Sequence, residues 1–199
     1  SDVSICADGT HTISGATASN STGFNWTTST VTGGTFVGGN TLTPTYTPSS
    51  SDIAAGSAML ILTVTGSQPC SPSASTMLLT INPLPIANIF TAGSTSFCEE
   101  DSLMLELDSV YTSIIWNTGS TDYFIYAATS GNYFATVTDT NNCSNNTNII
   151  NIDVHPKPVV DFIVDGICIN QPSRIVNIST ISSDSIISSI WYLSNGEVI

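Results

Sequence analysis

The chain has 199 residues, which is enough for one large domain or for two to three small ones. It carries 2 Lys and Arg against 15 Asp and Glu, a net charge of −13, which argues against a nucleic-acid partner and against docking on anionic lipid. Ser and Thr make up 58 residues, and the hydrophobic fraction of 41% is large enough to fill cores. This composition is typical of a β-rich extracellular protein.

The first predicted strand is the alternating stretch THTIS, residues 10–14, which carries His11. Further along, TVTGSQPC, residues 63–70, is a strand that runs into a polar turn and stops at Cys70. INPLP, residues 81–85, follows. Because proline fixes its own φ and favours extended backbone in the residue before it, this segment should be a short, stiff connector.

The most regular predicted strand is SLMLEL, residues 102–107, in which Leu103, Leu105 and Leu107 share one face. Four more stretches are rich in aromatic and β-branched residues: YTSIIW (111–116), DYFIYA (122–127), NYFATVT (132–138) and TNIINIDV (147–154). Turns fall about every eight to twelve residues, the spacing of a β-sandwich. No stretch has convincing helical periodicity.

These elements recur along the chain. A spacing of 73 residues separates three pairs: Cys70 and Cys143, Pro83 and Pro156, Pro85 and Pro158. Each tryptophan follows a cysteine at a similar distance: Trp26 after Cys6, Trp116 after Cys98, and Trp191 after Cys168. We therefore predict three copies of one plan, at residues 1–84, 85–157 and 158–199, the third being only the start of a copy. The stiff connectors should line the copies up end to end as a rod.

The second copy resembles an immunoglobulin-type domain in three stretches: EEDSLMLEL, Trp116 and TSGNYFATV. The resemblance implies that Trp116 is a buried core tryptophan, with Trp26 and Trp191 as its counterparts, and that Tyr133 forms a tyrosine corner. It also places Leu107 and Ala135 where immunoglobulin domains carry their core cysteines.

FCEED and TVTDTNNC (136–143) resemble the tandem Ig-like and PKD-like repeats of large secreted surface proteins of Bacteroidota. The first copy resembles a longer repeat of the same proteins, and the third resembles the PKD type, although WYLSNG departs from its acidic motif. The resemblance implies an all-β fold of tandem sandwiches. It also implies a secreted, cell-surface adhesin or filament, of the kind exported by type IX secretion and linked to gliding motility.

The five cysteines, Cys6, Cys70, Cys98, Cys143 and Cys168, are predicted to form disulfides, because an extracellular location is oxidising. We expect pairing within each copy, Cys6 with Cys70 and Cys98 with Cys143, leaving Cys168 to a partner beyond residue 199. In strict immunoglobulin topology, however, the two turns involved lie at opposite poles. The alternative pairs Cys6 with Cys143 across neighbouring copies and leaves Cys70 to a preceding copy.

We expect neither catalysis nor a cofactor, since HExxH, CxxC and GxSxG motifs are all missing from the sequence. Glu99, Glu100 and Asp101 form the densest acidic cluster and are weak Ca²⁺ candidates, but an acidic turn is the favoured interpretation. Asp139, Asn141 and Asn142 could ligate an ion as well, although their residue types favour a turn. His11 and His155 are expected to be solvated or strand-face residues.

Two features bear on glycans. Tyr123, Phe124 and Tyr126 form an aromatic cluster that we expect to pack in the core, with carbohydrate binding as the minority interpretation. Ser102, Ser109 and Ser185 each follow Asp and precede an aliphatic residue, a pattern that resembles the O-glycosylation motif of Bacteroidota. We expect these three serines to be exposed.

The leading functional hypothesis is a repeat segment of a long cell-surface filament or adhesin that holds a distal tip away from the cell. Its partners would be neighbouring repeats of the same polypeptide, surface glycans or other cell-surface proteins. Membrane insertion is not expected, because the longest mostly apolar run, Ile53 to Val64, is too short to cross a bilayer. The alternative is a non-catalytic accessory module, a spacer or carbohydrate-binding unit, of a secreted hydrolase. A third option is a ligand-binding tip.

Overall fold

The computed structural model describes residues 3–165, 174–183 and 185–192. In this part of the chain the secondary structure consists of eighteen strands and one short helix, so the predicted all-β fold is confirmed. The chain divides into two compact units. Unit one contains Ser1–Ala87, Ser109–Ile115 and Ala135–Thr147, and unit two contains Asn88–Asp108, Trp116–Phe134 and Asn148–Ile199.

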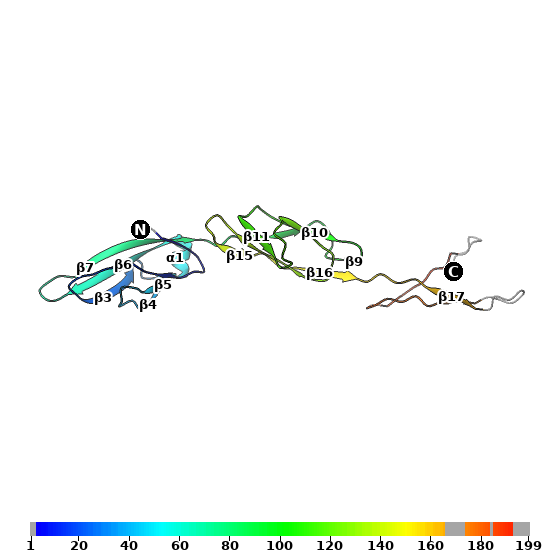
Figure 1. Ribbon diagram of the computed structural model, residues 1–199, viewed down its shortest axis with the longest axis horizontal. Coiled ribbons are helices and arrows are strands. Elements are labelled where there is room, and N and C mark those ends of the chain that lie inside the picture. The colour runs from blue at the N-terminus through cyan, green and yellow to red at the C-terminus, as the bar shows by residue number, and fades with distance from the viewer. Residues whose placement is uncertain (1–2, 166–173, 184, 193–199) are drawn as a thin grey trace, which may run out of the picture. The chain divides into compact units, whose positions relative to one another are not determined.

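Unit one contains a β-sandwich formed by the first repeat (Figure 1). Its larger sheet has the order β1 (Val3–Cys6), β7 (Ser73–Asn82), β6 (Ser57–Gly66), β3 (Ser21–Thr28). Its smaller sheet has the order β2 (His11–Thr12), β5 (Thr45–Thr47), β4 (Thr35–Val37).

The core of this sandwich comes from the alternation of its strands. Leu60 and Leu62 of β6 and Leu79 and Ile81 of β7 are buried, while Met59 and Leu78 between them are exposed. Trp26 of β3 and Tyr46 of β5 complete the cluster, together with Ile13 and Ala58. Each buried aliphatic side chain stabilises the fold by about 1.5–3 kcal/mol.

The helix α1 (Ser50–Ala55) corrects the expectation that the chain has no helix. The Ser49 side chain accepts a hydrogen bond from the backbone N–H of Asp52, and the Asp52 side chain accepts one from the N–H of Ser49. This capping box satisfies donors that the first turn would otherwise leave unpaired. Gly56 ends the helix in the left-handed conformation, with φ of 70°. Six residues are too few to show a period in the sequence.

Unit one also contains a three-stranded sheet from the second repeat, in the order β11 (Ser113–Trp116), β14 (Ala135–Thr138), β15 (Ser144–Asn146). All of β11 except Trp116 belongs to this unit. Ala135 and Val137 of β14 are fully buried, and the residues between and after them are half-buried. The turn from β14 to β15 carries Cys143.

Unit two contains three sheets. The first has the order β12 (Phe124–Ala127), β10 (Leu103–Leu107), β8 (Ile89–Thr91). The second has the order β13 (Gly131–Tyr133), β16 (Ile150–His155), β9 (Ser96–Cys98). The third is the pair β17 (Phe162–Asp165) and β18 (Arg174–Asn177). In β10, Leu103, Leu105 and Leu107 are all buried, and the two residues between them are only half-buried, as their alternation predicts.

The first and last strands pair in the same way in both repeats. β1 runs parallel to β7, with Cys6 opposite Asn82, and β9 runs parallel to β16, with Cys98 opposite His155. In each case a proline follows the last strand directly, at Pro83 and at 156. The two repeats therefore share the parallel pairing of their first and last strands, although these strands differ in length.

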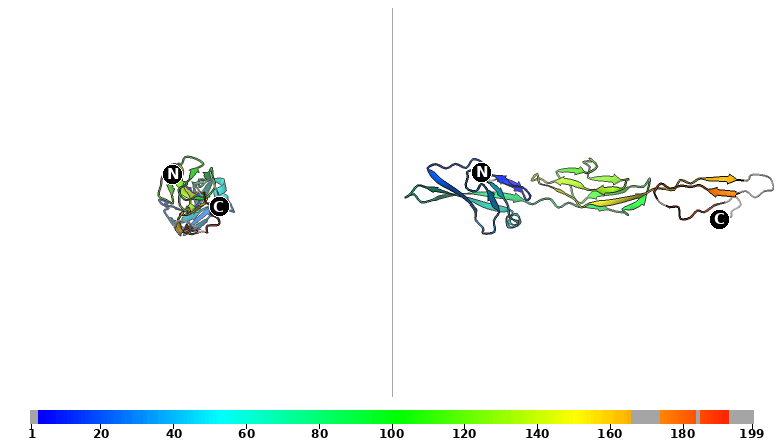
Figure 2. Two further views of the ribbon diagram at one scale, coloured as in Figure 1. Left: turned by 90° about the vertical axis from the view of Figure 1, so that its right-hand side faces the viewer. Right: turned by 90° about the horizontal axis from the view of Figure 1, so that it is seen from below.

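The described part of the third repeat is an antiparallel pair, β17 and β18, which lie side by side in Figure 2. A single bridge between Val159 and Thr180 extends it. Trp191 is half-buried, and its ring contacts Phe162 edge-on at a centroid distance of 5.4 Å. Cys168 lies outside the described residues.

Candidate functional site

The described part of the chain contains one disulfide, between Cys6 and Cys143, whose Cα atoms are 5.5 Å apart. Cys6 is the last residue of β1 in the first repeat, and Cys143 lies in the β14–β15 turn of the second. Both residues belong to unit one. In the predicted division of the chain, the bond therefore links two consecutive copies covalently.

The expected pairing within each copy is wrong, and the alternative across copies is the one observed. Parallel pairing of β1 with β7 places Cys6 opposite Asn82, at the end of β7, whereas Cys70 lies just before its start at Ser73. Ten strand residues span about 33 Å, and disulfide formation needs Cα atoms within roughly 7 Å. Cys70 and Cys98 are free and exposed.

The turn around Cys143 is held by Asp139. Asp139 Oδ1 accepts hydrogen bonds from the backbone N–H groups of Asn141 at 2.8 Å and of Cys143 at 2.9 Å. The backbone N–H of Asp139 donates in turn to the carbonyl of Cys143 at 2.9 Å. Asn142 adopts a positive φ of 61°, which asparagine tolerates better than most residues. This Asp and Asn turn places the fully buried Cys143 toward Cys6.

The connector after β7 is fixed by hydrogen bonds on both sides. Ala7 N–H donates to Asn82 O at 2.9 Å, next to Cys6. From the second repeat, Asn145 Nδ2 donates to Pro85 O at 3.0 Å and the Tyr111 hydroxyl donates to Ile86 O at 3.1 Å. The disulfide and these hydrogen bonds together restrict the movement of the connector within unit one.

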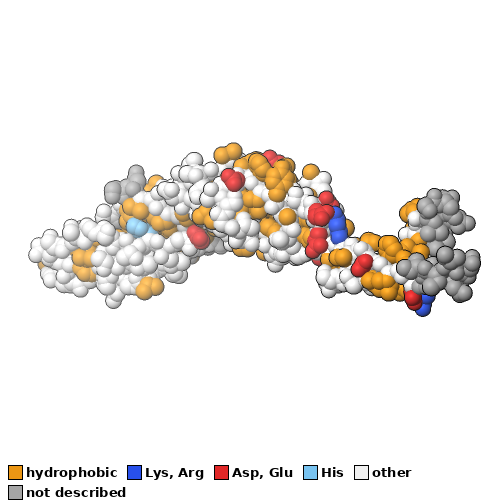
Figure 3. Space-filling view, turned by 45° about the vertical axis from the view of Figure 1, so that its right-hand side comes forward, with side chains coloured by type: hydrophobic (Ala, Val, Ile, Leu, Met, Phe, Trp, Pro, Cys, Tyr) orange, Lys and Arg blue, Asp and Glu red, His pale blue; other side chains and the backbone are white. Residues whose placement is uncertain are grey.

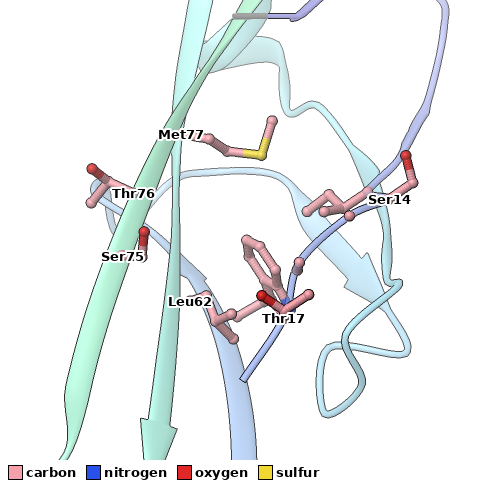
Figure 4. A pocket seen from close by; sticks show the side chains of 10 residues that line it. Ser14, Thr17, Leu62, Ser75, Thr76 and Met77 are labelled. Carbon is pink, nitrogen blue, oxygen red and sulfur yellow. The ribbon is translucent and has the colours of Figure 1, made fainter. Parts of the chain in front are cut away.

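A hollow of about 350 Å³ lies in the first repeat, beside Trp26. Figure 4 shows the Met77 side chain pointing from β7 toward the segment that carries Ser14 and Thr17. The polar side chains that line it are all hydroxyls, those of Ser14, Thr17, Ser75 and Thr76, and none of its lining residues titrates. Its chemistry suits a neutral ligand and offers no general acid or base. The sequence held no signal for it.

A buried carboxylate, Asp52, organises the smaller sheet and α1. Its Oδ2 accepts hydrogen bonds from Gly34 N at 2.7 Å, the Tyr46 hydroxyl at 2.8 Å, and Ser49 N and Oγ at 2.9 and 2.6 Å. Burial alone would raise the pKa of Asp52, but the hydrogen bonds from Ser49, Tyr46 and Gly34 lower it below its ordinary value. Burial and the bond to Asp52 raise the pKa of Tyr46 to about 12. This network is structural, and the Ser49-x-x-Asp52 spacing was its signal in the sequence.

The acidic turn at Glu99 to Asp101 contacts a lysine. The Lys157 ammonium donates to Glu100 Oε2, and the Lys157 backbone N–H donates to Glu99 Oε2 at 3.3 Å. The hydrogen bond and charge of Lys157 lower the pKa of Glu100, and the pKa of Lys157 is raised by the same contact.

In the described ranges, no three His, Cys, Asp or Glu side chains are grouped so that they could hold a metal ion. His155 is exposed and contacts Ser96 Oγ at 2.9 Å.

The predicted core tryptophans differ in burial. Trp26 is buried and its indole N–H donates to Thr41 O, while Trp116 is 1% exposed and donates to Asp122 O. Trp191 is only half-buried in the described part of the third repeat. The Tyr133 hydroxyl donates to Thr129 O at 3.0 Å, four residues upstream, which is the geometry of a tyrosine corner.

Two of the three clustered aromatics, Phe124 and Tyr126 on β12, face outward, contrary to the expectation of core packing, while Tyr123 just before the strand is half-buried. Phe124 is 43% and Tyr126 63% exposed, and their rings meet edge to face at 5.8 Å. Glu106 of β10 lies between Phe124 and the exposed Phe90 of β8 in one cross-strand row. On the opposite, inward face of this sheet, Ala127 and the leucines of β10 are buried in the core.

The three serines of the Asp-Ser-aliphatic motifs, Ser102, Ser109 and Ser185, are all exposed. Figure 3 shows one face of the molecule, on which charged side chains are few and most atoms belong to neither the charged nor the hydrophobic class. Among the described residues, no helix is long and apolar enough to cross a membrane.

No family model matches the sequence, and neither does any curated protein. Among solved structures, the chain is similar to the N-terminal four Ig domains of Dscam1 isoform 7.44, with 10% identity over 77% of this chain and 43% of that one, at a TM-score of 0.31. It is also similar to murine CEACAM1b, with 12% identity over 76% of this chain and 95% of that one, at 0.31. Protocadherin Gamma B2 extracellular cadherin domains 3–6 match with 11% identity over 90% of this chain and 54% of that one, at 0.34. The chain spans less than half the length of the Dscam1 fragment, and TM-scores this low assign neither a family nor a function.

Proposed function

We propose that the chain is a structural or adhesive repeat segment of an extracellular protein, and that it spaces a distal tip from the cell. The observation that carries this proposal is the disulfide between Cys6 and Cys143. Disulfides persist in oxidising compartments, and this one ties a repeat to its neighbour instead of closing a single domain. A bond of that kind suits a protein whose role depends on keeping repeats together.

The finer proposal divides the chain into repeats at residues 1–84, 85–157 and 158–199. Cys98 occupies the same place on β9 as Cys6 on β1, so it would bond to the following repeat, and Cys70 to a preceding one. The sequence stretches FCEED and TVTDTNNC support a surface protein of the Bacteroidota type, exported by type IX secretion and serving gliding or adhesion. Its partners would be neighbouring repeats and surface glycans or proteins.

The proposal is tested on intact cells of the source organism. An antibody raised against this chain should label cells whose membranes are unbroken, and protease treatment of those cells should remove the signal. Labelling only after permeabilisation would overturn an extracellular role. Antigen found free in the medium, in one polypeptide with a hydrolase, would favour the accessory module.

One observation favours that second candidate. The outer face of β8, β10 and β12 exposes Phe90, Phe124 and Tyr126 around Glu106, and aromatic rings of this kind can stack on sugars. If the chain is a carbohydrate-binding accessory module, Tyr126→Ala should weaken retention in gels that contain soluble polysaccharides. Thr136→Ala, on the separate sheet of β14, is the control. Equal mobility of wild type and Tyr126→Ala in every gel would rule out this face.

A further inference from the structure

The Cys6–Cys143 bond closes a loop with a sequence separation of 137 residues. All of the strands from β2 to β14, and the connector between the first two repeats, lie inside this loop. While the bond is intact, the Cα atoms at the two ends of the loop stay 5.5 Å apart. A force applied to the two ends of the chain therefore has a covalent path that does not pass through the loop.

Both ends of this path are anchored in folded structure. Cys6 ends β1, and Ala7 directly after it is hydrogen-bonded to Asn82. Cys143 is fully buried, and its backbone N–H is held by Asp139. Burial of Cys143 limits attack by dissolved thiols at its own sulfur, while Cys6 is half-buried.

We propose that the Cys6–Cys143 disulfide carries tension through this chain, and that it keeps residues 7–142 from being extended. Tension entering at the N-terminus passes along β1, crosses the disulfide and leaves through β15 and β16. Within the loop, tension acts only where β7 pairs with β1 and where β14 pairs with β15, and the chain between Cys6 and Cys143 is not extended while the bond is intact. This inference rests on the proposed structural role for its biological meaning, but the mechanical behaviour belongs to the chain itself.

The path separates a strand inside the loop from a strand beyond it. Leu60 in β6 and Ile152 in β16 are both buried aliphatic residues, with 0% and 2% exposure. Leu60 lies inside the loop on a strand that pairs with β3 and β7 and not with β1, whereas Ile152 lies beyond Cys143 and is in the load path. Truncation of either side chain removes similar packing, so the two variants form a matched pair.

The first test measures contour length by pulling single chains from handles at both ends. The background carries Cys70→Ser, Cys98→Ser and Cys168→Ser, so that only the observed pair remains. Adding Cys6→Ser should release a further contour length of roughly 450–490 Å, because 137 residues extend by about 3.3–3.6 Å each. Equal total lengths with and without Cys6→Ser would overturn the proposal, and the result does not depend on how well the variant folds.

The second test compares rupture forces in the linked chain. Ile152→Ala should lower the force at which the second repeat unfolds, and Leu60→Ala should leave every rupture force unchanged. In the Cys6→Ser chain, both substitutions should lower a rupture force. Equal sensitivity of the linked chain to both substitutions would show that tension crosses the first repeat, and would overturn the load path. These outcomes are separate from antibody labelling of cells, so either proposal can fail alone.

Discussion

Asp52 shows how a single side chain organises the first repeat. It is the one buried carboxylate among the described residues, and from its place on α1 it accepts hydrogen bonds from the N-cap Ser49, from Tyr46 of β5 and from Gly34 before β4. Gly34, one of its donors, has no room for a side chain, since a Cβ there would lie 2.0 Å from Thr47 O. The network therefore constrains a loop, a strand and a helix at the same point.

The pH dependence of stability should reveal this network. Because the pKa of Asp52 is lower in the folded chain than in the unfolded one, its contribution is present above the unfolded pKa and is lost as the pH falls below about 4. Asp52→Asn should lower the free energy of unfolding at pH 7 by about 1–3 kcal/mol and reduce its loss on acidification. Urea unfolding at pH 7 and pH 3 measures both effects. Asp101→Asn, at an exposed carboxylate, should change neither, and an unchanged Asp52→Asn chain would contradict the role of the network.

The exposed serines lead to a second prediction at this scale. Ser102 lies just before β10 and Ser109 just after it, and Ser185 is exposed in the third repeat. Glycans on these hydroxyls would be solvated and would not disturb the inward leucines. Native material should therefore have an intact mass above that of the polypeptide, and Ser-to-Ala changes at these sites should remove the excess. A native mass equal to the bare chain would end this hypothesis.

At the scale of elements, local alternation explains β10 well. Leu105 is fully buried between Met104 and Glu106, which are half-buried, and the strand pairs with β8 on one side and β12 on the other. A strand in the middle of a sheet has no exposed edge, so its inward side chains contribute their full packing.

A matched pair of truncations tests this packing. Leu105→Ala should lower the free energy of unfolding by about 2–5 kcal/mol, because it leaves a cavity at a fully buried position. Met104→Ala, one residue away on the other face of β10, should cost less than about 1 kcal/mol. Chemical denaturation followed by tryptophan fluorescence gives both values. Similar losses for the two variants would mean that the inward and outward faces of β10 have been misassigned.

At the scale of the whole molecule, prolines and the disulfide act together. Pro83 and Pro85 stiffen the connector, Asn145 and Tyr111 hydrogen-bond to its carbonyls, and Cys6–Cys143 closes it covalently. Each contact restricts the connector by a different means, so loss of one should leave the others in place.

The arrangement of the repeats as a rod is a prediction from these stiff connectors. If each sandwich adds some 30–40 Å, the chain should scatter X-rays as an elongated particle. Small-angle scattering of the oxidised chain measures this directly. A curve that fits a near-spherical particle would contradict the rod, and a chain with Cys6→Ser and Cys143→Ser would show how much the disulfide contributes to it.

Local patterns in the sequence predicted β10 and several other strands, but not β1, β3 or β7. Period-two alternation depends only on the pleat of the backbone, so the inward face of β10 could be predicted from its leucines alone. The buried position of Trp116 and the tyrosine corner of Tyr133 were implied by the resemblance to an immunoglobulin-type domain. The helix α1 was missed because its capping box extends over only four residues, from Ser49 to Asp52.

Tertiary structure alone decided which cysteines meet and which face the aromatics take. Spacing predicts that Cys6 and Cys70 belong to one copy, but the parallel register of β1 on β7 puts Cys6 at the far end of β7 from Cys70. Phe124 and Tyr126 share one face by alternation, yet only the packing of the sheet made that face the outer one. Both outcomes depend on contacts between residues far apart in the chain, and a disulfide forms only where folding brings two sulfur atoms within bonding distance.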